Sequence, residues 1–162
     1  MIKNTLLNQK CKRVAKRRTQ EHSSYVSATH IGILYNKDEF ETNLVRSVLE
    51  ENLKDDGKNI SMLAFQQKET DVPYSFSKKN ITISGDLDKD SANYFIKQSF
   101  DFLITLDTSG DIHFKYVLAM SKAVCKIGIY SKAYSDLLLM TLKPSKNPTE
   151  SIEDLIKYLK MI

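Results

Sequence analysis

The chain has 162 residues, of which 41% are hydrophobic and 27% charged, values that predict one globular domain and exclude a disordered chain. It contains no run of about 18 apolar residues, so we expect no membrane-spanning helix. The net charge of +4 is unevenly distributed, since residues 1–22 carry seven basic side chains and one acidic one, whereas residues 23–162 carry 17 basic and 19 acidic ones. An N-terminal segment of charge +6 thus precedes a body of charge −2.

The N-terminal segment has the pattern of a helix. Residues 3–21 contain neither Gly nor Pro, and one helical stripe is formed by Leu7, Cys11, Val14 and Arg18. This predicts a basic helix with a narrow apolar seam. We divide the chain into a basic helical arm (1–22), a polar linker (23–29) and a single α/β domain (30–162). A solvated extension packed loosely on the body and a cleaved transit peptide are alternative interpretations of the arm.

The cysteines and the N-terminus indicate the compartment. Cys11 and Cys125 lie far apart and have neither CxxC nor metal-ligand spacing, so we expect reduced thiols in a reducing environment. A basic run follows residues 1–7, where a signal peptide would have its apolar core. We therefore expect a cytoplasmic protein.

From residue 30 onward, short apolar runs alternate with helical patterns. The apolar runs predict buried strands at residues 30–36, 59–65, 101–107, 126–130 and 136–142. Helical spacing predicts helices at about residues 38–54, 89–99 and 112–125, and a last helix capped by Asn147. Strands joined through helices form βαβ crossovers, which make neighbouring strands parallel. The fold class is therefore α/β, a three-layer Rossmann-like protein with a mostly parallel sheet behind a basic N-terminal helix.

Residues 74–84 have a different character. Apolar and polar side chains alternate at period two in residues 74–77 and 81–84, on either side of residues 78–80. Such alternation is typical of a strand with one solvated face, and it predicts a hairpin or two short pieces. We expect these pieces to form an antiparallel edge of the otherwise parallel sheet.

Ligands of doubly wound sheets bind beyond the carboxyl ends of the strands. Asn36 ends the first predicted strand, and Asp107, Thr108 and Ser109 stand between the central strand and a helix N-terminus, where an anion can be held. These four are the candidate ligand-binding residues. The loop has a single glycine, Gly110, and two flanking acids that would repel phosphate. A small enzyme or sensor that binds a nucleotide or phosphorylated metabolite here is the alternative function.

Other motifs lead to no catalytic or metal site. Asp86, Asp88 and Asp90 alternate as at the start of an EF-hand loop, but Ser91 replaces the required Gly and Lys97 the bidentate Glu. The three histidines lack metal-ligand spacing, and no G-x-S-x-G elbow is present. We therefore expect no metal and no cofactor, nominate no catalytic residue, and favour a binding protein over an enzyme.

Residues 30–36, 101–106, 119–123 and 126–128 resemble an uncharacterised domain-of-unknown-function family of small α/β proteins from Bacteroidota that have a basic N-terminal helix. The resemblance covers most of the chain and implies a fold without an activity. Residues 101–128 are also similar to one Rossmann-type half of a glycosyltransferase of the heptosyltransferase kind. The second half and its donor site are absent from this sequence, so this similarity implies the fold only.

The basic arm carries the main functional hypothesis. Clustered Lys and Arg neutralise phosphates and release counterions. We expect a non-enzymatic cytoplasmic protein that docks on RNA or a ribonucleoprotein such as the ribosome through Lys10, Lys12, Arg13, Lys16, Arg17 and Arg18. An anionic membrane surface would attract the same charges, although the arm lacks the large aromatic or Leu-rich face of a membrane-surface helix.

Overall fold

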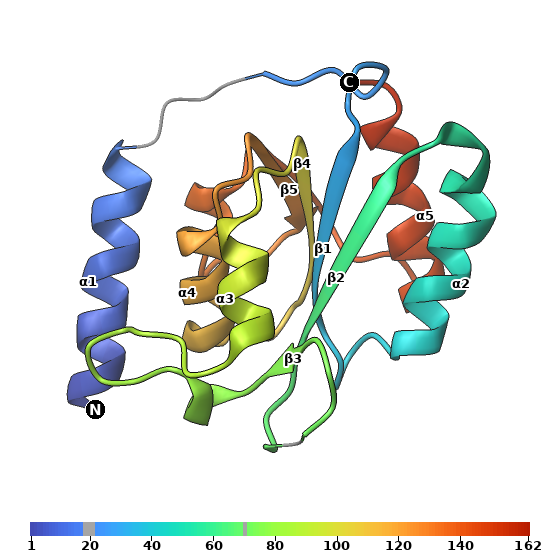
Figure 1. Ribbon diagram of the computed structural model, residues 1–162. Helices are drawn as coiled ribbons and strands as arrows, with labels where there is room; N and C mark the ends of the chain where they lie inside the picture. Colours follow the sequence, from blue (N-terminus) through green and yellow to red (C-terminus); the bar gives the residue numbers. More distant parts are fainter. Residues whose placement is uncertain (18–21, 70) are drawn as a thin grey trace.

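The structure, a computed structural model, describes residues 1–17, 22–69 and 71–162. It has three layers, with a sheet between two layers of helices (Figure 1). All six strands are parallel, in the order β3 (Ser75–Phe76), β2 (Asn59–Phe65), β1 (His30–Asn36), β4 (Phe102–Leu106), β5 (Cys125–Ile129) and β6 (Met140–Leu142). This is the three-layer Rossmann-like α/β fold that the sequence predicts.

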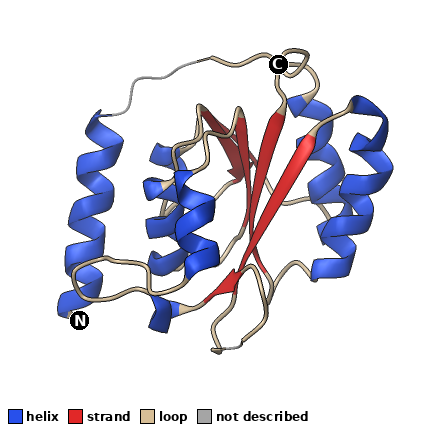
Figure 2. Cartoon of the chain, viewed as in Figure 1, coloured by secondary structure: helices blue, strands red, loops and turns tan. Residues whose placement is uncertain are grey.

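Helices cover both faces of the sheet (Figure 2). One layer contains α1 (Ile2–Arg17), α3 (Asp90–Lys97) and α4 (Ile112–Met120). The other layer contains α2 (Thr42–Leu53) and α5 (Pro148–Leu159). Three short 3-10 helices are η1 (Lys54–Asp56), η2 (Lys78–Asn80) and η3 (Ser135–Leu137). Because a strand turns alternate side chains to opposite faces, each layer of helices closes its own half of the core.

The central strand β1 shows this division of the core. Ile31 and Ile33 pack with the α2 and α5 layer, whereas Leu34 packs with the layer of α1, α3 and α4. Ile31, Ile33 and Leu34 all have no exposed surface. Burial on both faces is the reason that β1 has a continuous apolar run in place of an alternating one.

Two strands have the predicted bounds, whereas β4 lacks the first and last residues of the predicted 101–107 and β5 lies one residue earlier than the predicted 126–130. Residues 30–36 and 59–65 are β1 and β2. The last helix begins as predicted, because the Asn147 side chain accepts a hydrogen bond from the Glu150 N–H at 2.9 Å. The strand expected at 136–142 is shorter, since η3 occupies its first residues and only β6 pairs with the sheet.

The antiparallel edge predicted for residues 74–84 is wrong. β3 is parallel to β2, with Ala64 opposite Ser75 and Phe65 opposite Phe76. Alternation at period two predicts a half-exposed strand but not its direction, which depends on the strand that it joins. Ser75 and Phe76 are also buried rather than placed at a solvated edge.

A capping box prevents a second strand directly after β3. The side chain of Asn80 accepts a hydrogen bond from the Ser77 N–H at 2.8 Å, and the Ser77 hydroxyl caps η2. The chain therefore turns into a 3-10 helix where the sequence suggested a hairpin. In the described part of the chain, the one antiparallel pairing is an isolated bridge between Ile81 and Leu87.

The N-terminal helix α1 packs along α4. Leu7 and Cys11, two residues of the predicted apolar seam, have no exposed surface, and Val14 is half-buried. Arg18, the fourth residue of that seam, lies outside the described residues. Burial raises the pKa of the Cys11 thiol to about 11, so this thiol is protonated at neutral pH. The seam is narrow, but it attaches α1 to the body.

Two lysines of α1 also bind the loop that follows β3. The Lys3 ammonium donates a hydrogen bond to the Lys78 carbonyl at 2.7 Å, and the Lys10 ammonium donates to the Ser84 carbonyl. Both lysines are half-buried. These contacts and the apolar seam place α1 beside α3 and α4 on the same face of the sheet (Figure 1).

Asp101 ties the entrance of β4 to the entrance of β1. Its carboxylate accepts hydrogen bonds from the Thr29 N–H at 2.8 Å and from the His30 N–H at 2.9 Å. Burial by itself would raise the pKa of Asp101, but the hydrogen bonds to the charged form outweigh burial and lower the pKa. The ionised carboxylate is therefore the form that the fold stabilises.

We expect Asp101→Ala to lower the free energy of unfolding by about 1 kcal/mol at neutral pH, because two backbone donors lose a charged acceptor that is partly exposed. Since the pKa is lowered in the folded state, this contribution exists above the unfolded-state pKa of about 3.9 and is lost as the pH falls through the folded-state pKa. Urea denaturation at neutral pH and at about pH 3 checks this. A difference between Asp101→Ala and the native protein that stays constant with pH would contradict the expectation.

Candidate functional site

The strand order reverses between β1 and β4, since β2 and β3 lie on one side of β1 whereas β4, β5 and β6 lie on the other. Open α/β sheets bind ligands beyond the carboxyl ends of the strands at such a reversal. Asn36 ends β1 and Asp107 directly follows β4. The Asn36 side-chain amide donates a hydrogen bond to Asp107 Oδ1 at 2.7 Å, so these two predicted residues are neighbours in the fold.

Asp107 is the centre of this cluster and is fully buried. The Ser109 hydroxyl donates to its Oδ1 at 2.6 Å, and the Gly110 N–H donates to its Oδ2 at 2.9 Å. The Tyr134 hydroxyl lies 3.1 Å from Oδ2 and donates to the Asp107 carbonyl at 2.6 Å. Both carboxylate oxygens are thus hydrogen-bonded within the protein, which offsets the desolvation of the buried charge.

Tyr134 was missed by the sequence analysis, in which its loop is an ordinary polar segment. The side chain is completely buried, and burial, together with the charge and hydrogen bond of Asp107, raises its pKa far above the ordinary value. The phenol therefore remains protonated and acts as a donor. An aromatic residue in a polar loop is the one signal that the sequence offers, and it indicates burial without indicating the partner.

Glu39 is the second residue that the sequence analysis missed at this cluster. The Thr108 N–H and hydroxyl donate to the two carboxylate oxygens of Glu39 at 2.7 and 2.8 Å. Thr108 is thereby bound to the loop after β1 by a two-point contact. The four candidate ligand-binding residues Asn36, Asp107, Thr108 and Ser109 therefore lie together. Their polar atoms hold two loops together, and the carboxylates of Asp107 and Glu39 would repel a phosphate.

The predicted nucleic-acid-binding residues lie toward the C-terminal end of α1. Lys12, Arg13, Lys16 and Arg17 are exposed, and together they are called the basic surface of α1. Lys10 is half-buried by its contact with the loop after β3, and Arg18 lies outside the described residues. Cations in the last turn also complement the helix dipole, which accounts structurally for Lys16 and Arg17.

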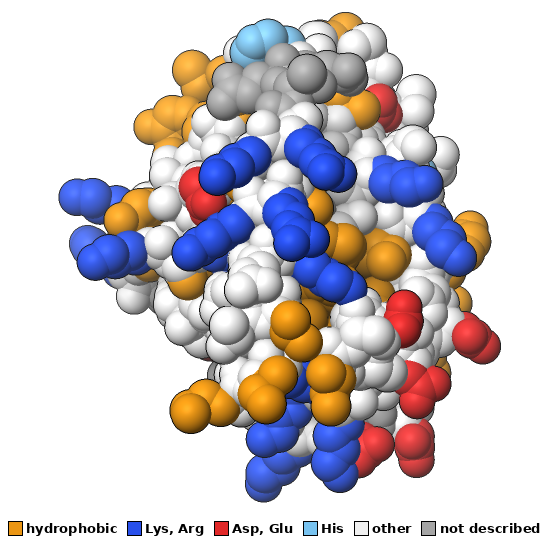
Figure 3. Space-filling view, turned by 90° about the vertical axis from the view of Figure 1, so that its left-hand side faces the viewer, with side chains coloured by type: hydrophobic (Ala, Val, Ile, Leu, Met, Phe, Trp, Pro, Cys, Tyr) orange, Lys and Arg blue, Asp and Glu red, His pale blue; other side chains and the backbone are white. Residues whose placement is uncertain are grey.

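Figure 3 shows the face of the molecule that α1 forms. Most Lys and Arg side chains gather in the upper half of this view, and a second group lies at the lower edge, beside the acidic side chains at the lower right. No acidic residue occurs in α1 itself. Next to α1 the body contributes both signs of charge, since Lys115 lowers and Asp136 raises the pKa of Cys11. The helix itself thus adds cations and no acid to this face.

The described residues show no further chemical centre. They contain no helix that is long and apolar enough to cross a membrane. Nor do these ranges hold a group of three or more His, Cys, Asp and Glu side chains arranged to bind a metal ion. The protein is thus defined by a three-layer Rossmann-like fold with a closed strand-end cluster and a basic helix packed on one face.

The chain belongs to the family of unknown function DUF6913, whose model matches residues 3–162. This confirms an uncharacterised domain family, and the match includes α1 together with the α/β body. No curated protein matches the chain. No solved structure matches it either.

Proposed function

We propose that this protein docks on RNA or a ribonucleoprotein through the basic surface of α1. The observation that supports the proposal is the exposure of Lys12, Arg13, Lys16 and Arg17 on a helix that contains no acid and is packed on the body. A helix that is already in place presents its cations without a further ordering cost on binding. The seam residues Leu7 and Cys11 thus serve the binding of phosphate indirectly, by holding α1 in position.

The spacing of the four cations suits a phosphate backbone. Lys12 and Lys16 are one helical turn apart, as are Arg13 and Arg17, so the cations form two adjacent rows with about 6 Å between successive Cβ atoms in each row. Arginine binds phosphate through two parallel hydrogen bonds, whereas lysine acts as a mobile point charge. Such a surface recognises charge and backbone shape, so we expect binding with little sequence preference.

The strand-end cluster also favours a binding role over catalysis. The carboxylate of Asp107 is buried and surrounded by its own donors, and Glu39 is hydrogen-bonded to Thr108. These hydrogen bonds give the buried polar groups of the cluster a structural role that needs no substrate. Binding of a nucleotide or phosphorylated metabolite at Asn36, Asp107, Thr108 and Ser109 stays the alternative prediction.

The test compares RNA binding by the full-length protein with that of a variant in which Lys12, Arg13, Lys16 and Arg17 are all replaced by Glu. We expect the variant to bind a single-stranded RNA of about 20 nucleotides at least ~100-fold more weakly, and the native protein to show a log–log salt slope of about −3 for four phosphate contacts. Fluorescence anisotropy at several salt concentrations measures both.

A matched control makes the same change of charge elsewhere, by replacing four exposed lysines with Glu: Lys54, Lys143, Lys146 and Lys157. This control should bind RNA far more tightly than the α1 variant. Equal binding by the two variants, or native binding that does not depend on salt, would sink the proposal. Substitution is preferable to truncation at Ser23, because truncation would also remove Leu7 and Cys11 from the core.

The membrane interpretation has one observation in its favour, since Met1, Ile2 and Leu6 are exposed at the first turns of α1. They lie at the opposite end of the helix from the basic surface. Flotation with and without acidic lipid tests this interpretation, because a protein that inserts these apolar side chains would also float with neutral vesicles, whereas attraction through the basic surface alone requires acidic lipid. The ribosome as the partner, the cytoplasmic location and the origin in Bacteroidota also stay predictions.

A further inference from the structure

The outer edge of β2 is unpaired along most of its length. β1 pairs with all seven residues from Asn59 to Phe65, whereas β3 pairs only with Ala64 and Phe65. Figure 1 shows β3 beside one end of β2 only. Among the described residues, no strand pairs with the outer edge of residues 59–63. Exposed edges of this kind accept an additional strand.

The direction of the backbone groups follows from the ladders on either side. The Asn59 N–H donates to the carbonyl just before β1 at 2.8 Å, and the Ala64 N–H donates outward to the Tyr74 carbonyl at 2.9 Å. Because successive residues of a strand point their N–H and C=O groups to opposite sides, Ile60 and Met62 point theirs outward, as Ala64 does. The free edge thus offers two N–H and two C=O groups at strand spacing.

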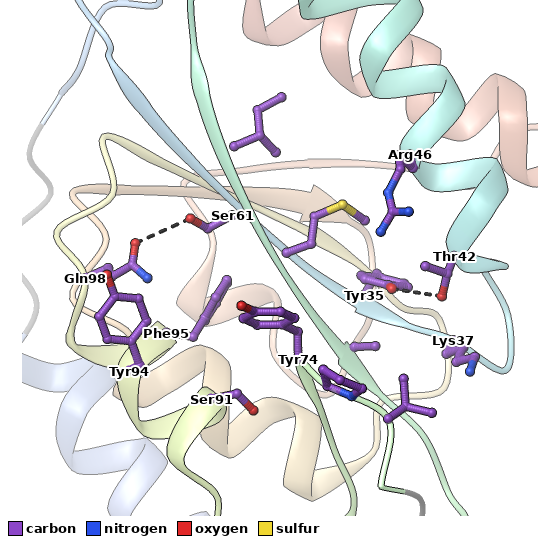
Figure 4. A pocket seen from close by; sticks show the side chains of 15 residues that line it. Tyr35, Lys37, Thr42, Arg46, Ser61, Tyr74, Ser91, Tyr94, Phe95 and Gln98 are labelled. Carbon is purple, nitrogen blue, oxygen red and sulfur yellow. Dashed lines mark hydrogen bonds between the residues drawn. The ribbon is translucent and has the colours of Figure 1, made fainter.

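Residues of this edge line a cavity of about 540 Å³ (Figure 4). Thr42 and Arg46 of α2 line one wall, and Tyr94 of α3 and Gln98, which directly follows α3, line the other. Tyr74 lies between these walls in the close view. The unpaired stretch of five residues is about 16 Å long, which suits a short extended peptide.

The lining of the cavity is positively charged and rich in aromatic surface. It includes Lys37 and Arg46 but no carboxylate. Tyr74 and Tyr94 are 67% and 69% exposed, although tyrosine is usually more buried. Tyr74 also adopts a φ of 57°, a region that is strained for a bulky residue. Strained residues concentrate at ligand clamps, and this one presents its ring to the cavity.

We propose that the free edge of β2 binds an extended peptide segment of a partner protein, which adds a strand to the sheet and places an acidic side chain near Lys37 and Arg46. Main-chain hydrogen bonds to Ile60 and Met62 bind a peptide of any sequence. The rings of Tyr74 and Tyr94 supply contact area for the apolar side chains of the peptide. A second copy of this chain fits less well, because a two-fold contact between these edges brings like charges together.

Proline at position 60 tests the role of the backbone. Ile60→Pro removes an outward N–H and leaves the ladder to β1 intact, a position where proline is tolerated in an edge strand. Ile60→Ala removes most of the same side chain but keeps the N–H, so it is the matched control. Random heptapeptides displayed on phage are selected on the full-length protein, and the affinities of the enriched peptides are then measured for each variant.

We expect the enriched peptides to alternate apolar and acidic residues, and to bind Ile60→Pro at least ~10-fold more weakly than Ile60→Ala. Arg46→Glu should weaken the same peptides at least ~10-fold, whereas Lys157→Glu, an equal charge change on α5, should not. No enrichment, or equal binding by Ile60→Pro and Ile60→Ala, would overturn the proposal. The α1 variant with four Glu substitutions should bind the peptides with the affinity of the native protein. Failure of the RNA proposal and failure of the peptide proposal can therefore be told apart.

Hydrogen exchange locates the peptide without relying on any variant. A bound enriched peptide should slow amide exchange at Ile60 and Met62, which have no partner strand on the outer side, and change little at Ser61, which already faces β1. Protection confined to other residues would refute the location. The native protein without peptide is the second control. If it sediments as a dimer and the same amides become protected as its concentration rises, a second copy occupies the edge, and the proposed partner peptide is overturned.

Discussion

Replacement of Asp107 by Ala should lower the free energy of unfolding by about 3–5 kcal/mol. Its buried carboxylate accepts hydrogen bonds from Asn36, Ser109 and Gly110 and lies against the Tyr134 hydroxyl. Alanine would leave several of these buried donors without an acceptor, and each such loss costs about 1–3 kcal/mol. Urea denaturation followed by circular dichroism measures the change.

Two further variants sharpen this experiment. Asp107→Asn keeps the shape of the side chain but replaces one acceptor by a donor, so its effect should lie between those of the native protein and Asp107→Ala. Ser109→Ala removes only the Ser109 hydroxyl, and Ser109 is an exposed residue. We expect this variant to lower the free energy of unfolding by less than about 1 kcal/mol. If Asp107→Ala were as stable as the native protein, the carboxylate would not be holding these loops, and the ligand-binding alternative would regain support.

A second large effect is expected from Gly128→Ala in β5. An added Cβ would lie 2.7 Å from the Thr105 carbonyl oxygen and closer still to the Thr105 hydroxyl. Thr105 and Gly128 are paired residues of β4 and β5, so the clash can be relieved only by separating two central strands. We expect the free energy of unfolding to fall by more than about 3 kcal/mol. Thermal unfolding of the purified variant measures it.

Gly57→Ala is the matched control for this prediction. Gly57 also resists substitution, because its φ is 64°, but a Cβ there would meet no atom within 4 Å. Gly57→Ala should lower the free energy of unfolding by about 1 kcal/mol, because backbone strain is its only cost. The double variant Thr105→Ala/Gly128→Ala removes the clash of the new Cβ with the Thr105 hydroxyl but keeps its clash with the Thr105 carbonyl oxygen. We therefore expect it to be more stable than Gly128→Ala and less stable than the native protein. Similar losses for Gly57→Ala and Gly128→Ala would contradict the packing explanation.

The strand-end cluster shows how far sequence reasoning reaches. Asn36 and Asp107 could be placed together in advance, because the carboxyl ends of parallel strands meet where the strand order reverses. Glu39 and Tyr134 could not be assigned to the cluster, since their loops reach it only when the whole sheet is assembled. These two residues help to determine the character of the cluster, as they occupy its polar atoms.

The N-terminal helix shows a similar limit. The stripe that contains Leu7 and Cys11 predicts a helix with one apolar side, but the surface that accepts this side belongs to α4, about a hundred residues further along the chain. Only the tertiary structure shows both residues fully buried, and with them the basic surface of α1 held on the body.

The sequence by itself determined the fold class, the bounds of β1 and β2, the start of α5 and the separation of charge between arm and body. These properties depend on local periodicity, on capping side chains and on composition, all of which are properties of the chain before it folds. The tertiary structure alone decided the parallel direction of β3, the saturation of Asp107 and the free edge of β2. Each of these three properties depends on which distant segment packs against the residue or strand, or on where a neighbouring strand ends. Short-range sequence patterns do not specify either of these.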